Sequence, residues 1–195
     1  MTKIKTFFSG SDVGFLDTKQ PVGIMTNTYM PVLWRYIKPS GEVINMGIGS
    51  GTPDSVISIL DWPVQVRHFE LDNPRSVVIN PKESVVWNAD ILEELHKRES
   101  RSVNGVIIWH GPEHLDKDRG VEAIVEASRV ASRFVVLGCP WDRLKGWRKM
   151  KPGKDHLGHK SVWTETDFMG LGFRVAGFDK PQLYPGCLFA WKVNT

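Results

Sequence analysis

Three glycines at alternate positions, Gly47, Gly49 and Gly51, follow a short apolar run at residues 43–46. Glycine has no Cβ, so the first of them allows a sharp turn and the second lets a ligand approach the backbone closely. A helix is expected to follow, and this order presents backbone N–H groups and a helix N-terminus to a ligand. The spacing G-x-G-x-G departs from the dinucleotide fingerprint G-x-G-x-x-G at Thr52. The alternative is an ordinary strand-to-helix turn.

Two acidic residues are expected at the ends of the next two strands. Glu70 lies near the end of the expected second strand at residues 64–71, roughly 20 residues after the glycines, where an acid is suited to bind a pair of ribose hydroxyls. Asp90 ends a third expected strand at residues 84–90. A solvated strand-end carboxylate is the alternative for Glu70, and we favour the ribose contact because it explains the position.

A histidine-rich turn, His110-Gly111-Pro112-Glu113-His114-Leu115, follows the expected fourth strand at residues 103–109. His110 is the best-placed candidate for a general base, and orienting a ligand or capping a backbone group is an equal alternative for it. Glu113 is the second catalytic candidate. Other candidate bases are His114, His156 and His159.

The letters H-x-x-E-H also spell the inverted zinc-protease motif. That motif needs an uninterrupted helix, which brings both histidines to one face. Gly111-Pro112 interrupts the segment between His110 and His114. The sequence therefore predicts no metal site.

Strands and helices are expected to alternate along most of the chain, which is typical of an α/β domain whose parallel sheet is covered on both faces. The expected strands are residues 43–46, 64–71, 84–90, 103–109, 134–140, 172–178 and 187–193. The expected helices are residues 26–37, 54–60, 74–80, 91–100, 120–131 and 163–171, the last with Thr164 as N-cap and Asp167 three positions on. The last two strands predict a hairpin-like end.

The composition fits one soluble domain: 195 residues can form one α/β core, and the net charge of +3 does not require a nucleic-acid partner. Cys139 and Cys187 are too few for a disulfide framework, and we expect both to be reduced and mostly buried. No apolar run reaches the length of a signal peptide or a membrane span. We expect a cytoplasmic protein without membrane insertion.

Two segments have no clear periodicity. Residues 1–25 are expected to form an irregular arm. Residues 142–162 are expected to form a basic insertion loop over the carboxyl ends of the strands, with seven Lys or Arg, Trp147 inside it and Trp141 and Trp163 at its two ends. Such a loop suits a phosphate backbone, an anionic small substrate or a solvated lid.

The motifs in this order resemble those of class I S-adenosylmethionine-dependent methyltransferases, over residues 26–195. The similar segments are Asn45 to Gly51, with Asn45 where an aspartate is common, Phe69-Glu70-Leu71, Asn88-Ala89-Asp90-Ile91, Trp109 to Leu115, and His159 to Val175 with Trp163 and Leu171-Gly172-Phe173.

The resemblance implies a single-domain, Rossmann-like doubly wound sheet of about seven strands, mostly parallel with an antiparallel C-terminal strand. It implies S-adenosyl-L-methionine as cofactor and S-adenosyl-L-homocysteine as product. The cofactor-binding residues it implies are Asn45, Gly47, Gly49, Gly51, Glu70, Leu71, Asp90, Ile91 and His110.

A small-molecule or glycan-like methyl acceptor is expected from the same resemblance. The alternatives are an RNA methyltransferase that uses the basic segment 143–160, and a protein of this fold that binds a cofactor or partner without catalysis. A nicotinamide oxidoreductase is disfavoured by the glycine spacing and by the hairpin end.

Overall fold

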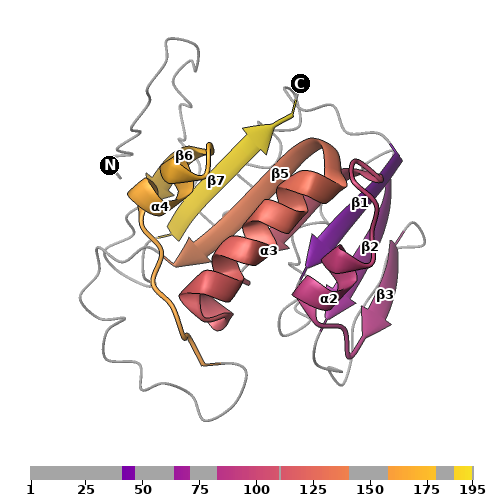
Figure 1. Ribbon diagram of the computed structural model, residues 1–195, viewed down its shortest axis with the longest axis horizontal. Coiled ribbons are helices and arrows are strands. Elements are labelled where there is room, and N and C mark those ends of the chain that lie inside the picture. Colours follow the sequence, from indigo (N-terminus) through magenta and orange to yellow (C-terminus); the bar gives the residue numbers. More distant parts are fainter. Residues whose placement is uncertain are drawn as a thin grey trace, which may run out of the picture.

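The computed structural model describes residues 41–46, 64–70, 83–109, 111–140, 158–178 and 187–194. Within these residues, seven strands form one sheet in the order β3–β2–β1–β4–β5–β7–β6 (Figure 1). The strands are β1 (Gly41–Met46), β2 (Val64–Glu70), β3 (Glu83–Trp87), β4 (Val103–Trp109), β5 (Ala131–Pro140), β6 (Arg174–Phe178) and β7 (Cys187–Val193). Strands β1 to β5 are mutually parallel, and β7 runs antiparallel to both β5 and β6. The expected α/β class, mostly parallel sheet and antiparallel C-terminal strand are confirmed.

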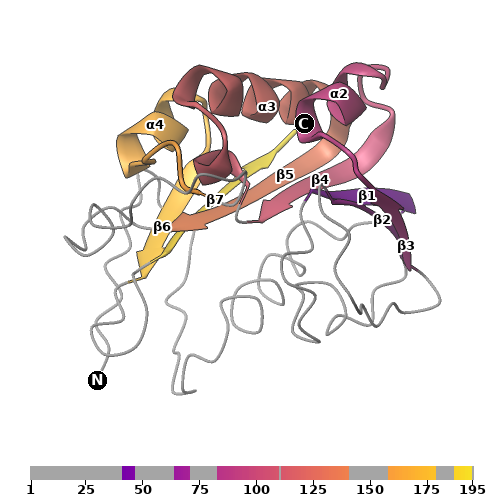
Figure 2. The same ribbon diagram turned by 90° about the horizontal axis from the view of Figure 1, so that it is seen from below.

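The helices of the described residues lie on one face of the sheet (Figure 2). They are α2 (Ile91–His96), α3 (Lys117–Val130) and α4 (Glu165–Gly170), with a 3-10 turn, η1 (Pro112–His114), before α3. The helices expected at residues 26–37, 54–60 and 74–80, and the arm at residues 1–25, lie outside the described residues. No helix of the described ranges has the length and apolar character that crossing a membrane requires.

The core follows the central strands. Val43 and Ile44 of β1 are both fully buried although they point to opposite faces of the sheet, and the same holds for Val106 and Ile107 of β4. Parallel strands that are buried on both faces read as continuous apolar runs, which is why these strands were predictable from sequence. Cys139 is buried in this core, as expected.

Several boundaries differ from the prediction. The third strand ends at Trp87 rather than at Asp90, because Asn88 adopts a positive φ of 56° that breaks the extended backbone. Asp90 then caps α2, which ends at His96 rather than near residue 100. Helix α3 begins at Lys117, before the expected start at Gly120.

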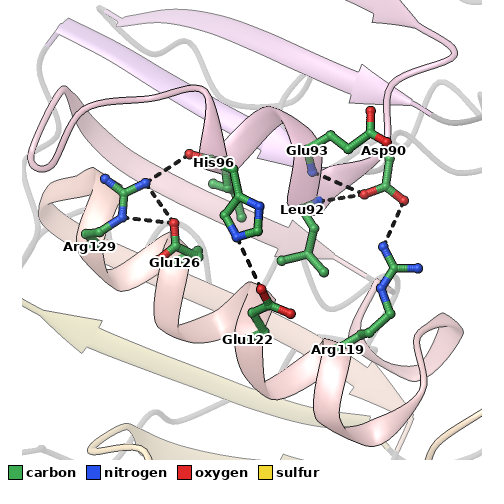
Figure 3. A network of polar contacts seen from close by, with 9 residues as sticks. Asp90, Leu92, Glu93, His96, Arg119, Glu122, Glu126 and Arg129 are labelled. Atoms are coloured by element: carbon green, nitrogen blue, oxygen red, sulfur yellow. Dashed lines mark hydrogen bonds and ion pairs between the residues drawn. The ribbon is translucent and has the colours of Figure 1, made fainter.

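Helix α3 holds the short helix α2 at both ends (Figure 3). Arg129 of α3 donates hydrogen bonds to the carbonyl oxygen of Leu95 (3.1 Å), in the last turn of α2, and to that of Arg98 (2.9 Å), just beyond the helix. At the other end, Arg119 Nη2 lies 3.5 Å from Asp90 Oδ2. A six-residue helix is marginal by itself, so these contacts fix where Asp90 stands.

Candidate functional site

The carboxyl ends of the parallel strands align at one edge of the sheet. In the register of β1, Met46 lies opposite Phe69 of β2 on one side and Ile108 of β4 on the other. The next residues of those two neighbours are Glu70 and Trp109, the last residues of their strands. Glu70 and Trp109 therefore flank, at one level, the point where the chain leaves β1 for the glycine-rich segment.

The strand order reverses at this point. From β1 the chain builds β2 and β3 on one side, and it returns to build β4 and β5 on the other. In open α/β sheets, ligands bind outside the carboxyl ends of the strands at such a switch point. We call the described candidates at this edge, Asn45, Glu70, Asp90 and Ile91, the strand-end site.

The strand-end residues differ in what surrounds them. Asn45 is 1% exposed within β1, so its amide is part of the interior. Glu70 is the last residue of β2, which fixes its backbone position. Ile91 opens α2 and packs, partly buried, against the core. The other predicted cofactor residues, Gly47, Gly49, Gly51, Leu71 and His110, lie outside the described residues.

Asp90 has a structural role that the sequence analysis missed. Its Oδ1 accepts hydrogen bonds from the backbone N–H groups of Leu92 (2.9 Å) and Glu93 (3.2 Å), so it is the N-cap of α2 (Figure 3). Its Oδ2 faces Arg119. The signal was available, because an Asp that precedes a helix is a preferred N-cap. A ligand would therefore compete with Arg119 for Oδ2.

Within the histidine-rich turn, Pro112 to His114 form the 3-10 element η1 and not an α-helix, as expected from Gly111-Pro112. The carboxylate of Glu113 lies in the interior, with the residue 2% exposed. Glu113, His114 and His159 each place one ligand atom within 4.8 Å of the other two. We call this trio the Glu113–His159 corner. The sequence offered all three as candidate bases, and the H-x-x-E-H motif linked His114 to His110; no local spacing connects His159 to Glu113 or His114.

The described end of the basic segment, from residue 158, is anchored to η1 by backbone hydrogen bonds. The carbonyl oxygen of Glu113 accepts from the N–H groups of Lys160 (2.8 Å) and Ser161 (3.2 Å). The Ser161 hydroxyl also donates to the carbonyl oxygen of Pro112 at 3.1 Å. These bonds place His159 beside η1. Residues 143–157, with His156, lie outside the described residues.

No family model matches this chain. No curated protein matches it either. Solved structures do match. A methyltransferase from Archaeoglobus fulgidus is 20% identical with a TM-score of 0.58, covering 86% of this chain and 94% of its own. The Burkholderia thailandensis 1,6-didemethyltoxoflavin-N1-methyltransferase is 13% identical with a TM-score of 0.60, covering 85% of this chain and 76% of its own. The magnesium protoporphyrin IX methyltransferase of Synechocystis is 15% identical with a TM-score of 0.57, covering 87% and 83%.

The chain has the fold of the class I methyltransferases. At these sequence identities the similarity shows a shared fold, which for this chain means the sheet order and the switch point given above.

Within this methyltransferase fold, Trp163 locks the segment that carries His159. Trp163 is 1% exposed, and its ring stacks on Phe168 with centroids 5.2 Å apart. The Trp163 indole N–H donates to the Ser161 hydroxyl at 2.9 Å. The ring packs so closely on α3 that a Cβ at Gly120 would lie 2.5 Å from Trp163 Cζ2. This packing holds the segment against α3 through the buried Trp163 ring.

Charged groups complete the same contact. Lys117 Nζ lies 3.8 Å from the centroid of the Trp163 ring, donates to the Val162 carbonyl oxygen at 2.8 Å, and lies 2.8 Å from Asp167 Oδ2. Thr164 and Asp167 form the capping box of α4, which confirms the predicted N-cap. Burial raises the pKa of Asp167, but hydrogen bonds from Lys117 and Thr164 outweigh it and hold the pKa below its ordinary value of 3.8.

Proposed function

We propose that the protein is an S-adenosylmethionine-dependent methyltransferase whose cofactor lies across the carboxyl ends of β1, β2 and β4. The observation that carries the proposal is the switch point beside β1, with Glu70 level with the start of the glycine-rich segment. The Burkholderia and Synechocystis structures of the same fold hold S-adenosylhomocysteine, which supports this cofactor.

Each predicted residue then has a part in cofactor binding. Glu70 accepts hydrogen bonds from the two ribose hydroxyls, and Asp90 accepts from the adenine amino group through Oδ2. Ile91 and Leu71 contact the faces of the adenine ring. The methionine portion passes over the glycine turn, whose residues are Gly47, Gly49 and Gly51, with Asn45 beneath it at the end of β1.

The chemistry needs little from the protein beyond geometry. The sulfonium is already activated, so an in-line displacement depends mainly on holding the acceptor atom at near-attack distance. A general base is needed only if the acceptor must lose a proton. In this proposal His110 either takes that proton or orients the cofactor, and Glu113 is the second catalytic candidate.

The acceptor we propose is a small molecule or a glycan-like metabolite. Two of the methyltransferases named above are named for small aromatic substrates, 1,6-didemethyltoxoflavin and magnesium protoporphyrin IX. An RNA acceptor bound by residues 143–160 is the second candidate, because that segment carries seven lysines and arginines, with Trp147 inside it and Trp141 and Trp163 beside it. A cofactor-binding protein without transferase activity is the third.

Isothermal titration calorimetry with S-adenosylhomocysteine, S-adenosylmethionine and NAD tests the cofactor. We expect micromolar binding of the two sulfur ligands and none of NAD. Glu70→Ala should weaken S-adenosylhomocysteine binding about tenfold to a hundredfold, because hydrogen bonds to a charged group contribute about 1.5–3 kcal/mol. Glu99→Ala removes an exposed acid beyond α2 and is the matched control, with unchanged affinity expected.

An unchanged affinity in a folded Glu70→Ala variant would remove Glu70 from the site. If the folded wild-type protein binds neither sulfur ligand, the methyltransferase proposal is wrong. Formation of S-adenosylhomocysteine with small-molecule acceptors, compared with RNA, separates the two acceptor classes, and binding without turnover on any acceptor supports the non-catalytic alternative.

A further inference from the structure

The Glu113–His159 corner brings two imidazoles and one carboxylate together inside the fold. Their ligand atoms all lie within 4.8 Å of one another. His114 Nε2 lies 3.9 Å from Glu113 Oε1, and the rings of His114 and His159 meet edge to face at 76° with centroids 4.9 Å apart. The Nδ1 atom of His114 is buried and has no hydrogen-bond partner in the part of the chain that the structure describes.

We propose that Glu113, His114 and His159 bind one divalent transition-metal ion. Imidazole nitrogen suits zinc, copper, iron and nickel, whereas magnesium and calcium prefer sites made of oxygen alone. Two histidines and one glutamate are a ligand set of catalytic zinc sites, which keep a further position open for water or substrate.

The geometry needs only side-chain adjustment. Metal–ligand bonds of about 2.0–2.2 Å put two ligand atoms roughly 3–3.5 Å apart around one ion. The spacing of 3.9 Å between His114 and Glu113, and of at most 4.8 Å within the trio, is closed by small rotations of three side chains. The backbone need not move. The carbonyl oxygen of Glu113 already accepts hydrogen bonds from the N–H groups of Lys160 and Ser161, and these bonds hold the His159 segment against η1.

The trio differs from the inverted zinc-protease motif H-x-x-E-H that the sequence contains at residues 110–114. That motif needs His110 and His114 on one face of a continuous α-helix, whereas Pro112 to His114 form the 3-10 turn η1. Here the second imidazole comes from His159, which Trp163 and Ser161 hold against η1. The metal site thus depends on a tertiary contact between two segments.

The alternative is that the histidines serve only to neutralise a buried carboxylate. A carboxylate that is 2% exposed is costly unless it is paired or hydrogen-bonded, and one protonated imidazole would be enough for that. That alternative predicts no affinity for metals, so a binding measurement distinguishes it from the proposal.

A metal here would also bear on methyl transfer, a step that rests on the proposed function. Glu113 and His114 follow β4 directly, at the edge of the sheet where the strand-end site lies, and His159 joins them from the segment before α4. An acceptor oxygen bound at an open metal position would lose its proton more readily. Activity is therefore a secondary readout, and metal binding is measured without cofactor.

The primary experiment titrates Co²⁺ into the tag-free full chain and follows its visible absorption, with Zn²⁺ competition and elemental analysis of the dialysed protein. We expect one equivalent of bound metal. His159→Asn should lower the affinity by at least about tenfold, since altering even the groups behind metal ligands costs tenfold to a hundredfold. His96→Asn removes a histidine that contacts Glu122 on the surface at 3.2 Å, and it should bind Co²⁺ as the wild type does.

Absence of Co²⁺ and Zn²⁺ binding to the folded wild-type protein would overturn the metal site. Equal losses in His159→Asn and His96→Asn would do the same, because they indicate surface binding. His159→Asn should keep its affinity for S-adenosylhomocysteine, so that loss of metal with retained cofactor separates this proposal from the proposed function. Glu113→Gln, which keeps the buried volume, should lower metal affinity like His159→Asn.

Discussion

The strand-end site and the Glu113–His159 corner lie at the same edge of the sheet and are built in different ways. The strand-end site is fixed by the sheet ladder: Met46 in register with Phe69 and Ile108 determines where the neighbouring strands end. The corner is fixed by side chains that join two segments distant in sequence, with Trp163 inserted against Gly120. Backbone register places Asn45 and Glu70 of the strand-end site, whereas Asp90 at the start of α2 and the whole Glu113–His159 corner depend on individual side-chain contacts.

The largest expected effect breaks the corner and leaves the strand-end site intact. A Cβ at Gly120 would meet the buried Trp163 ring at 2.5 Å and the Pro112 carbonyl oxygen at 3.3 Å. Gly120→Ala should therefore lower the free energy of unfolding by about 1–3 kcal/mol, although alanine normally favours a helix. Urea denaturation measures this, and Co²⁺ affinity should fall while S-adenosylhomocysteine affinity holds.

Gly170→Ala is the matched control for that substitution. Gly170 ends α4, and a Cβ there meets nothing within 4 Å. The change should be neutral or stabilise the protein by up to about 1 kcal/mol, because alanine loses less backbone entropy in a helix. Similar destabilisation by both substitutions would contradict the role given to the Gly120–Trp163 contact.

The next prediction concerns Asp90 of the strand-end site and separates its role as a helix cap from its proposed role in binding the cofactor. Asp90→Ala removes the N-cap of α2 and should cost about 1 kcal/mol of stability. Asp90→Ser keeps a capping oxygen but is too short to reach a ligand, so it should retain the stability and share the loss of S-adenosylhomocysteine affinity. Full affinity in Asp90→Ser would limit Asp90 to the capping role.

The smallest effect is a pH dependence at Asp167, in the α4 cap beside Trp163 and Lys117. The folded-state pKa of Asp167 lies below its ordinary value, so its ionised form stabilises the fold above the unfolded-state pKa of about 3.9 and that contribution is lost as the pH falls through the folded value. Asp167→Asn should reduce stability by a constant amount between pH 7 and pH 5, and the deficit should shrink below about pH 4. Urea denaturation across this range checks it, and a deficit independent of pH would contradict the charge argument.

Some of the fold could be read from the sequence because the central strands are continuous apolar runs. The bounds of β4 and β7 were predicted as they are found, and the N-cap Thr164 was recognised from its spacing to Asp167. The positive φ of Asn88 was not foreseen, so Asp90 was predicted at the end of a strand although it is the N-cap of α2. Periodicity does not report a single residue with positive φ.

The α/β class, the mostly parallel sheet and the order of glycines and acids follow from the sequence, because each depends on residues close together in the chain. That Asp90 is held between α2 and Arg119 is visible in the folded chain alone. So is the meeting of His159 with Glu113 and His114, since that meeting depends on how Trp163 packs against Gly120. A contact between distant segments arises from shape and volume in three dimensions, which residue spacing does not encode.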